Sequence, residues 1–174
     1  MHFTSTPLFP CMTDAGDPTE IRSLAVTVED VVAALELNQT TARRAVLRVT
    51  PPFSGRMRAR LHVVLEREPA SSEAKRDGDQ RPLHVDPESL LKADAPSYPK
   101  PSETEDELRN DPGETYSVER HHDRHVVAVA DWRTGVADAI CERTTIQTPA
   151  GPHEVDVLTL GDPPAGDSDY RTSS

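Results

Sequence analysis

The alternation of residues on both sides of a proline-rich turn constrains the fold most strongly. Residues 44–50 and 56–63 place apolar side chains at every second position, which is the period of a β-strand with one buried face. The sequence PPFSG between them contains two prolines, and proline lacks the backbone N–H that a central strand donates. The sequence therefore predicts a β-hairpin with a five-residue connection.

The same alternation predicts a basic surface on this hairpin. Successive side chains of a strand point to opposite sides, so the residues between the apolar positions share the second face. Six arginines fall within positions 43–60 without one carboxylate, although the formal net charge of the chain is -11. Glu154 and Asp156, on one side of a later strand, are the expected carboxylate partners within the chain. We call the following residues the basic face: Arg44, Arg48, Arg56, Arg58, Arg60 and His62.

The composition favours an environment of concentrated salt. Thirty Asp and Glu face nineteen Lys and Arg, and only three of these are lysine. Excess carboxylate, scarce lysine and small apolar side chains resemble the cytoplasmic proteins of halophilic archaea, in which carboxylates keep the surface hydrated. We therefore expect a protein that works in molar salt.

The N-terminal sequence and the hydropathy predict a cytoplasmic location without membrane contact. The first residues lack the basic and apolar segments of a signal peptide, and no apolar stretch approaches the roughly 18 residues that cross a membrane. Translation is expected to begin at Met12, which would leave Cys141 as the single thiol and exclude an internal disulfide.

Two helices and a second hairpin are expected outside the basic face. Thr27 is a suitable cap for a helix over about 28–37, with Asp30 three residues later as in a capping box. From residue 117 onwards, apolar and histidine side chains recur every three or four positions, which is typical of a long amphipathic helix. The run 126–130 also fits a strand. Residues 144–157 contain a second alternating pair around the turn PAGP.

These elements predict an α+β fold made of two helix-hairpin units. Because a single hairpin is marginal alone, we expect the hairpins to form one four-stranded antiparallel sheet with the helices on one face. The compact domain would cover residues 21–161. The expected segments are a disordered tail (1–20), a helix with the arginine-rich hairpin (21–66), a flexible polar linker with a short helix near 87–92 (67–116), a long helix with the second hairpin (117–161) and a disordered tail (162–174).

A histidine cluster in the long helix raises the alternative of metal binding. His121 and His125 lie one turn apart, and their ring nitrogens could jointly bind a metal ion. The spacing supplies no third ligand, and His122 stands where the zincin motif has glutamate. We expect no cofactor and interpret these histidines as ordinary helix residues, with metal binding as the alternative.

The chain resembles short haloarchaeal proteins that carry domains of unknown function. The likeness rests on two pairs of segments, TVEDVVAALELN with RVTPPFSGRMRARLHV and RHHDRHVVAVADW with TPAGPHEVDVLTLG. These segments contain no catalytic motif. The resemblance therefore implies a source and no activity.

The sequence favours a non-catalytic adaptor whose basic face binds an acidic protein, and nucleic-acid binding through the same face is the alternative. Six phosphate contacts would lose roughly seven decades of affinity between about 0.15 M and about 3 M salt. The Debye length is only about 3 Å at 1 M salt. Arginine still forms short bidentate bonds to carboxylates under these conditions. A carboxylate partner is therefore the leading hypothesis, and no catalytic residue is expected.

Overall fold

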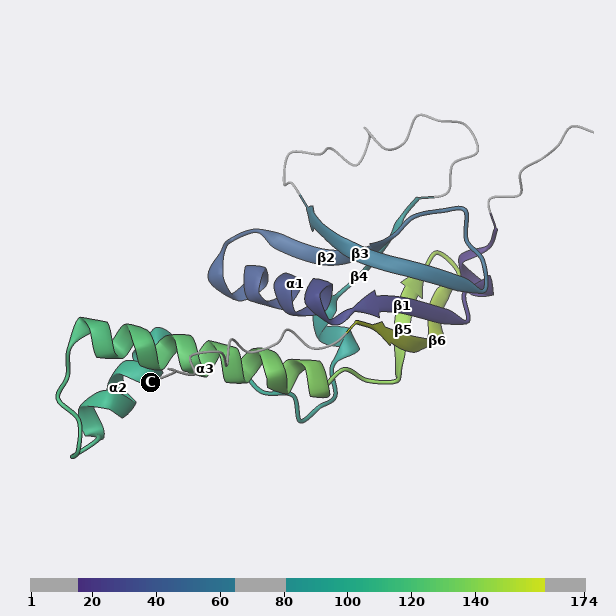
Figure 1. Cartoon of the computed structure of the whole chain (residues 1–174). Helices are drawn as coiled ribbons and strands as arrows, with labels where there is room; N and C mark the ends of the chain where they lie inside the picture. Colours follow the sequence, from purple (N-terminus) through teal and green to yellow (C-terminus); the bar gives the residue numbers. More distant parts are fainter. Residues whose placement is uncertain (1–15, 65–80, 162–174) are drawn as a thin grey trace, which may run out of the picture.

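The computed structural model describes residues 16–64 and 81–161, which form a six-stranded mixed sheet with three α-helices (Figure 1). The strands lie in the order β4–β2–β3–β1–β6–β5. Two antiparallel hairpins, β2–β3 and β5–β6, pair with opposite edges of β1. The strand bounds are Ser23–Thr27 (β1), Arg44–Val49 (β2), Arg56–Val64 (β3), Leu83–Val85 (β4), Arg143–Thr148 (β5) and Gly151–Leu160 (β6).

The predicted four-stranded antiparallel sheet built from two helix-hairpin units is wrong. β1 lies between the two hairpins and is parallel to both β3 and β6, and β4 adds a further antiparallel strand beside β2. These two strands contain only five and three residues, so their alternation is too short to indicate a strand. Thr27 also belongs both to β1 and to the N-cap of the helix that follows. Because Thr27 is interpreted only as a helix cap, the sequence does not indicate the strand that ends at the same residue.

The two edges of the sheet approach each other, so that the sheet is nearly barrel-shaped. β4 and β5, at the two ends of the strand order, are in contact. The 3₁₀ helix η2 (Pro87–Leu90) links them. Thr144 Oγ1 of β5 donates a hydrogen bond to Ser89 O at 2.6 Å, and Cys141 N donates to Leu90 O at 2.8 Å. Both edges of the sheet are thereby partly covered, which limits edge-to-edge pairing with other chains.

Helix α1 (Val28–Thr40) covers the inner face of the sheet. Thr27 Oγ1 accepts a hydrogen bond from Asp30 N at 3.2 Å, so the predicted cap is present at the start of the helix. Near the other end, the Asn38 side chain accepts from Ala45 N at 2.7 Å and donates to Ala45 O at 3.0 Å. These bonds fix the entry into β2, and therefore the register of the arginine-rich hairpin relative to α1.

Helix α3 (Val118–Asp138) packs on the body of the protein with its C-terminal half and extends away from the sheet with its N-terminal half (Figure 1). Trp132 of this half is buried in the core. Arg133 donates to the Glu36 carboxylate of α1 from Nη2 at 2.8 Å and from Nε at 3.1 Å. The hydrogen bond with Glu36 raises the pKa of the Arg133 guanidinium. Helix α2 (Pro101–Asn110) packs against α3 and forms an arm with it.

Parts of the predicted tails and linker lie outside the described residues, namely residues 1–15, 65–80 and 162–174. The disorder expected for residues 1–15 and 162–174 stays a prediction, whereas Pro18–Glu20 of the predicted N-terminal tail form a 3₁₀ helix. The remainder of the predicted linker, residues 81–116, contains β4, η2 and α2. The polar composition of this segment therefore reflects an exposed arm and a short edge strand.

Substitution of the central strand tests this architecture. Leu24 is fully buried between the hairpins, so we expect Leu24→Ala to lower the free energy of unfolding by about 2–5 kcal/mol. Leu158→Ala is the matched control, because Leu158 lies on the neighbouring strand β6 but is 43% exposed to solvent. The control is expected to cost about 1 kcal/mol or less. Urea unfolding measures both, and equal losses would contradict the position of β1 in the core.

Candidate functional site

The arginine-rich hairpin places its basic residues on the outer face of the sheet. β2 and β3 pair over Arg44–Val49 and Ala59–Val64, and alternate apolar residues face the core while the arginines point the other way. Val46, which is paired with His62 on the arginine side, is also buried. Arg58 is exposed, whereas the adjacent Ala59 is fully buried. The two-residue period of the sequence therefore correctly predicts which side chains share a face. The exposed members of the basic face are Arg44, Arg56, Arg58 and Arg60, and the half-buried members are Arg48 and His62.

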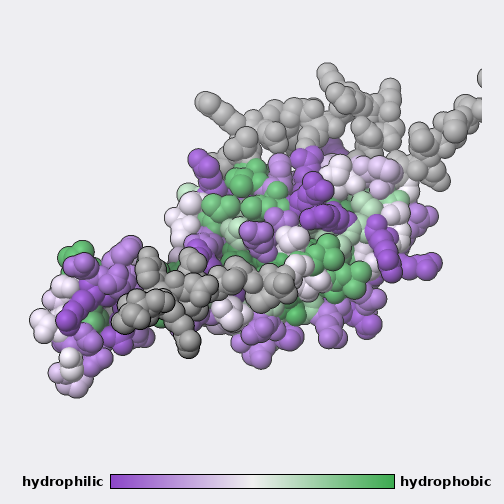
Figure 2. Space-filling view, in the orientation of Figure 1, coloured by the Kyte–Doolittle hydropathy of each residue, from purple (hydrophilic) through white to green (hydrophobic). Residues whose placement is uncertain are grey.

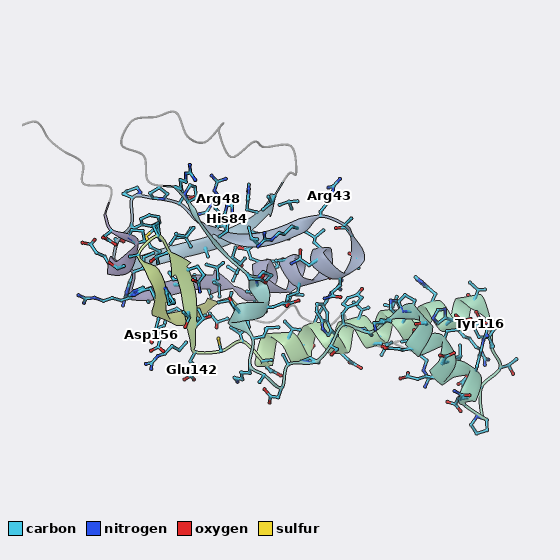
Figure 3. All side chains as sticks on the ribbon, turned by 180° about the vertical axis from the view of Figure 1, so that it is seen from behind. Arg43, Arg48, His84, Tyr116, Glu142 and Asp156 are labelled. Atoms are coloured by element: carbon cyan, nitrogen blue, oxygen red, sulfur yellow. The ribbon has the colours of Figure 1, made fainter. Side chains whose placement is uncertain are left out.

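The register brings basic residues of three strands together. Arg48 of β2 lies between Arg60 of β3 and His84 of β4, and Figure 3 shows Arg48 and His84 close together over the sheet. The rings of His62 and His84 stack with their centroids 5.7 Å apart. A depression of about 480 Å³ lies over this region, lined by the arginines of β3 together with Arg48 and Thr50.

His84 is the site residue that the sequence did not reveal. It belongs to β4, a strand of three residues in a segment with the composition of a linker. A faint signal is present, because Leu83 and Val85 flank His84 with the alternation of a strand that is buried on one side. The pairing of β4 with β2 depends on contacts distant in sequence, and local patterns do not specify them.

Arg22, Arg43 and Arg81 form no salt bridge within the described residues, but carboxylates neutralise the five arginines of the helices and of β5. Each of these five arginines forms a salt bridge, and in the arm the partners are local acids of α2 and of the turn that follows it. The Glu36 pair of Arg133 is bidentate. The set comprises Arg109, Arg120, Arg124, Arg133 and Arg143.

Glu154 and Asp156 do not neutralise the basic face. Both carboxylates lie beside Arg143 of the adjacent strand, at 3.5 Å and 3.2 Å. Asp156 shares a row with Arg56, but Ser23 of β1 stands between them. In Figure 3, Asp156 lies near Glu142, well away from Arg48. The expected pairing fails because β1 separates the two hairpins.

The exposed arginines of the basic face have a different environment. Within residues 16–64 and 81–161, no carboxylate forms a salt bridge with Arg44, Arg56, Arg58 or Arg60. Alternate residues of a strand repeat about every 6.6 Å, so β3 presents a row of evenly spaced guanidinium groups. Such groups bind planar oxyanions such as carboxylates and phosphates through paired N–H donors.

The predicted metal ligands contribute to helix packing in the arm. His121 Nε2 lies 2.9 Å from Pro101 O and 3.1 Å from Thr104 Oγ1, and His125 Nδ1 lies 3.3 Å from the same hydroxyl. Thr104 is buried, and its hydroxyl also donates to Pro101 O at 3.0 Å. The part of the chain that the structure describes holds no group of three residues suited to a metal ion. Metal binding by these histidines stays a prediction.

The face of the protein that Figure 2 shows is mostly polar along the arm and carries apolar residues over the body. In the space-filling view, hydrophilic residues cover most of the α2–α3 arm (Figure 2). None of the helices in residues 16–64 and 81–161 has the length and apolar character required to cross a membrane.

Comparison with known proteins adds the family of the chain to this geometry. The fold and the site define a class of small protein with a mixed sheet, in which the outer face of the β2–β3 hairpin is basic. The chain belongs to the family described as domain of unknown function DUF8009, whose model matches residues 12–161. The expected resemblance to uncharacterised domains is thus confirmed, and the haloarchaeal source stays a prediction. No curated protein and no solved structure matches the chain.

The contacts of Thr104 lead to a prediction for the α2–α3 arm. Thr104→Val removes the hydroxyl that lies beside both histidine rings, so we expect the free energy of unfolding to fall by about 1–2 kcal/mol. Thr134→Val is the matched control, because Thr134 is exposed on α3 and its hydroxyl bonds only its own helix. Urea unfolding monitored by circular dichroism compares the variants. Equal stability of both variants would exclude a packing role for Thr104.

Proposed function

We propose that this protein is a non-catalytic cytoplasmic adaptor that binds an acidic surface of another protein through its basic face. The proposal is carried by one contrast between two groups of arginines. The arginines of the helices and of β5 have carboxylate partners, whereas the exposed arginines of the basic face form no salt bridge within the described residues. In a chain with thirty Asp and Glu, this contrast favours a partner outside the chain.

The rigidity of the scaffold supports this function. β3 is paired on both sides, with β2 and with β1, so its backbone is held in place. A rigid backbone presents arginines at defined spacing, which lowers the entropic cost of binding. The face is also shallow, and its depression of about 480 Å³ is open to solvent. An open face of this kind suits a macromolecular surface better than an enclosed substrate.

Protein is preferred over nucleic acid because of the expected salt concentration. A halophilic origin, which the acidic composition favours, would screen phosphate contacts strongly. Short bidentate bonds between guanidinium and carboxylate groups depend on geometry as well as on charge. Nucleic-acid binding by the same face is therefore the second candidate, and salt dependence separates the two.

A charge-matched pair of triple variants tests the proposal. The test variant carries Arg56→Ser, Arg58→Ser and Arg60→Ser, and the control carries Arg109→Ser, Arg120→Ser and Arg124→Ser. Both lose three positive charges, but the control arginines lie in the arm and already have carboxylate partners. The wild type and both variants are used for pull-downs with and without nuclease treatment in about 2 M KCl, a concentration that suppresses simple phosphate contacts.

We expect the wild type and the control variant to retain the same acidic protein, and the test variant to lose it. Identical protein sets for all three would overturn the proposal. Capture that disappears after nuclease treatment would identify nucleic acid as the ligand instead. Circular dichroism of each variant checks that the fold is intact.

A further inference from the structure

The outer face of the sheet changes character across β1. On one side lie the arginines of β3, and on the other lies the C-terminal part of β6, where Leu158 and Leu160 are 43% and 41% exposed. They are the only leucines among the exposed large hydrophobic residues of the described chain. Apolar side chains rimmed by polar and charged residues mark interaction surfaces when they form one patch.

Small side chains separate these two sides. The outward residues of β1, which we call the β1 strip, are Ser23, Ala25 and Thr27, and each is half-buried. The register aligns these residues in rows across the sheet: Ala25 is paired with Arg58 on one side and with Leu158 on the other. Thr27 is likewise paired with Leu160. The side chains of β3 and β6 are therefore longer than those of the β1 strip between them.

Two depressions lie on the hairpins that flank the β1 strip, and neither is lined by a residue of β1. The one over β3 is lined by Arg56, Arg58 and Arg60. The other has a volume of about 630 Å³ and is lined by residues of β6 and β5, including Asp156 and Leu158. Asp156 is already paired with Arg143, so it does not neutralise the arginine row.

We propose that the β1 strip is the floor of a docking site for an extended peptide segment that alternates acidic and apolar side chains. The carboxylates would face the arginines of β3, and the apolar side chains would cover Leu158 and Leu160. This inference rests on the proposed function and specifies the partner chemistry for the same basic face.

The spacing supports an extended partner. Alternate side chains of an extended peptide repeat about every 6.6 Å, which equals the repeat of Arg56, Arg58 and Arg60 along β3. β3 and β6 are two strand spacings apart, or about 9.5 Å. A helix with its side chains is about 10–12 Å wide, whereas the backbone of an extended peptide is narrower and approaches the β1 strip more closely. An extended backbone fits, and its two rows of side chains meet β3 and β6 separately.

Two synthetic peptides of about eight residues, long enough to span the arginine row, test this inference. One alternates Glu and Val, and the other alternates Glu and Ser with the same charge. We expect the wild type to bind the Glu-Val peptide about tenfold more tightly, since binding covers two partly exposed leucines. The double variant Leu158→Ser and Leu160→Ser should lose this preference while its affinity for the Glu-Ser peptide stays unchanged.

A third variant tests the floor without altering charge. Ala25→Gln places a longer side chain between Arg58 and Leu158, so we expect weaker binding of both peptides by at least about tenfold. Equal affinity of the wild type for the two peptides, or a preference that survives in the leucine variant, would overturn the inference.

The outcomes separate this inference from the proposed function. The wild type could bind both peptides equally, and the variant with Arg56→Ser, Arg58→Ser and Arg60→Ser could bind neither. This result would support the proposed function and would exclude the β1 strip as part of the binding site. Binding of neither peptide to the wild type would count against both. The measurements use the full chain and fluorescence anisotropy of the labelled peptides.

Discussion

The structure depends on the pairing of one short strand with two hairpins. β1 has only five residues, yet its Leu24 and Val26 are fully buried, and its backbone is paired in parallel with β3 and β6. Burial of these side chains stabilises the sheet at its centre, and α1 begins directly where β1 ends. Without β1, the hairpins would have no common edge, and a two-stranded hairpin is only marginally stable in water.

The position of β1 also explains the charge pattern of the outer face. It holds the basic face two strands away from Glu154 and Asp156, which pair with Arg143 instead. α1 packs on the inner face, and α2 packs on α3. The described helices therefore leave the arginine row of β3 uncovered. The central position of β1 thus accounts both for the strand order and for the basic face on which the proposed function depends.

Local patterns in the sequence identified the elements that local physics determines. The alternation around PPFSG predicts the hairpin, and the Thr27 hydroxyl predicts the start of α1, because both depend on neighbouring residues. β1 and β4 are too short for a clear period, and their partners are distant in sequence. The same limit applies to the site. The arginines follow from a two-residue period, whereas His84 and the separation of Asp156 from Arg56 depend on strand order.

The proposed function depends on the exposed arginines of β3, which form no salt bridge with the carboxylates of residues 16–64 and 81–161. Modification with phenylglyoxal in molar KCl, followed by mass spectrometry, measures the reactivity of each guanidinium directly. Arg56, Arg58 and Arg60 should react faster than Arg133, which has a bidentate partner in Glu36. Reactivity of the β3 arginines as low as that of Arg133 would show that they are already paired and would contradict the proposed function.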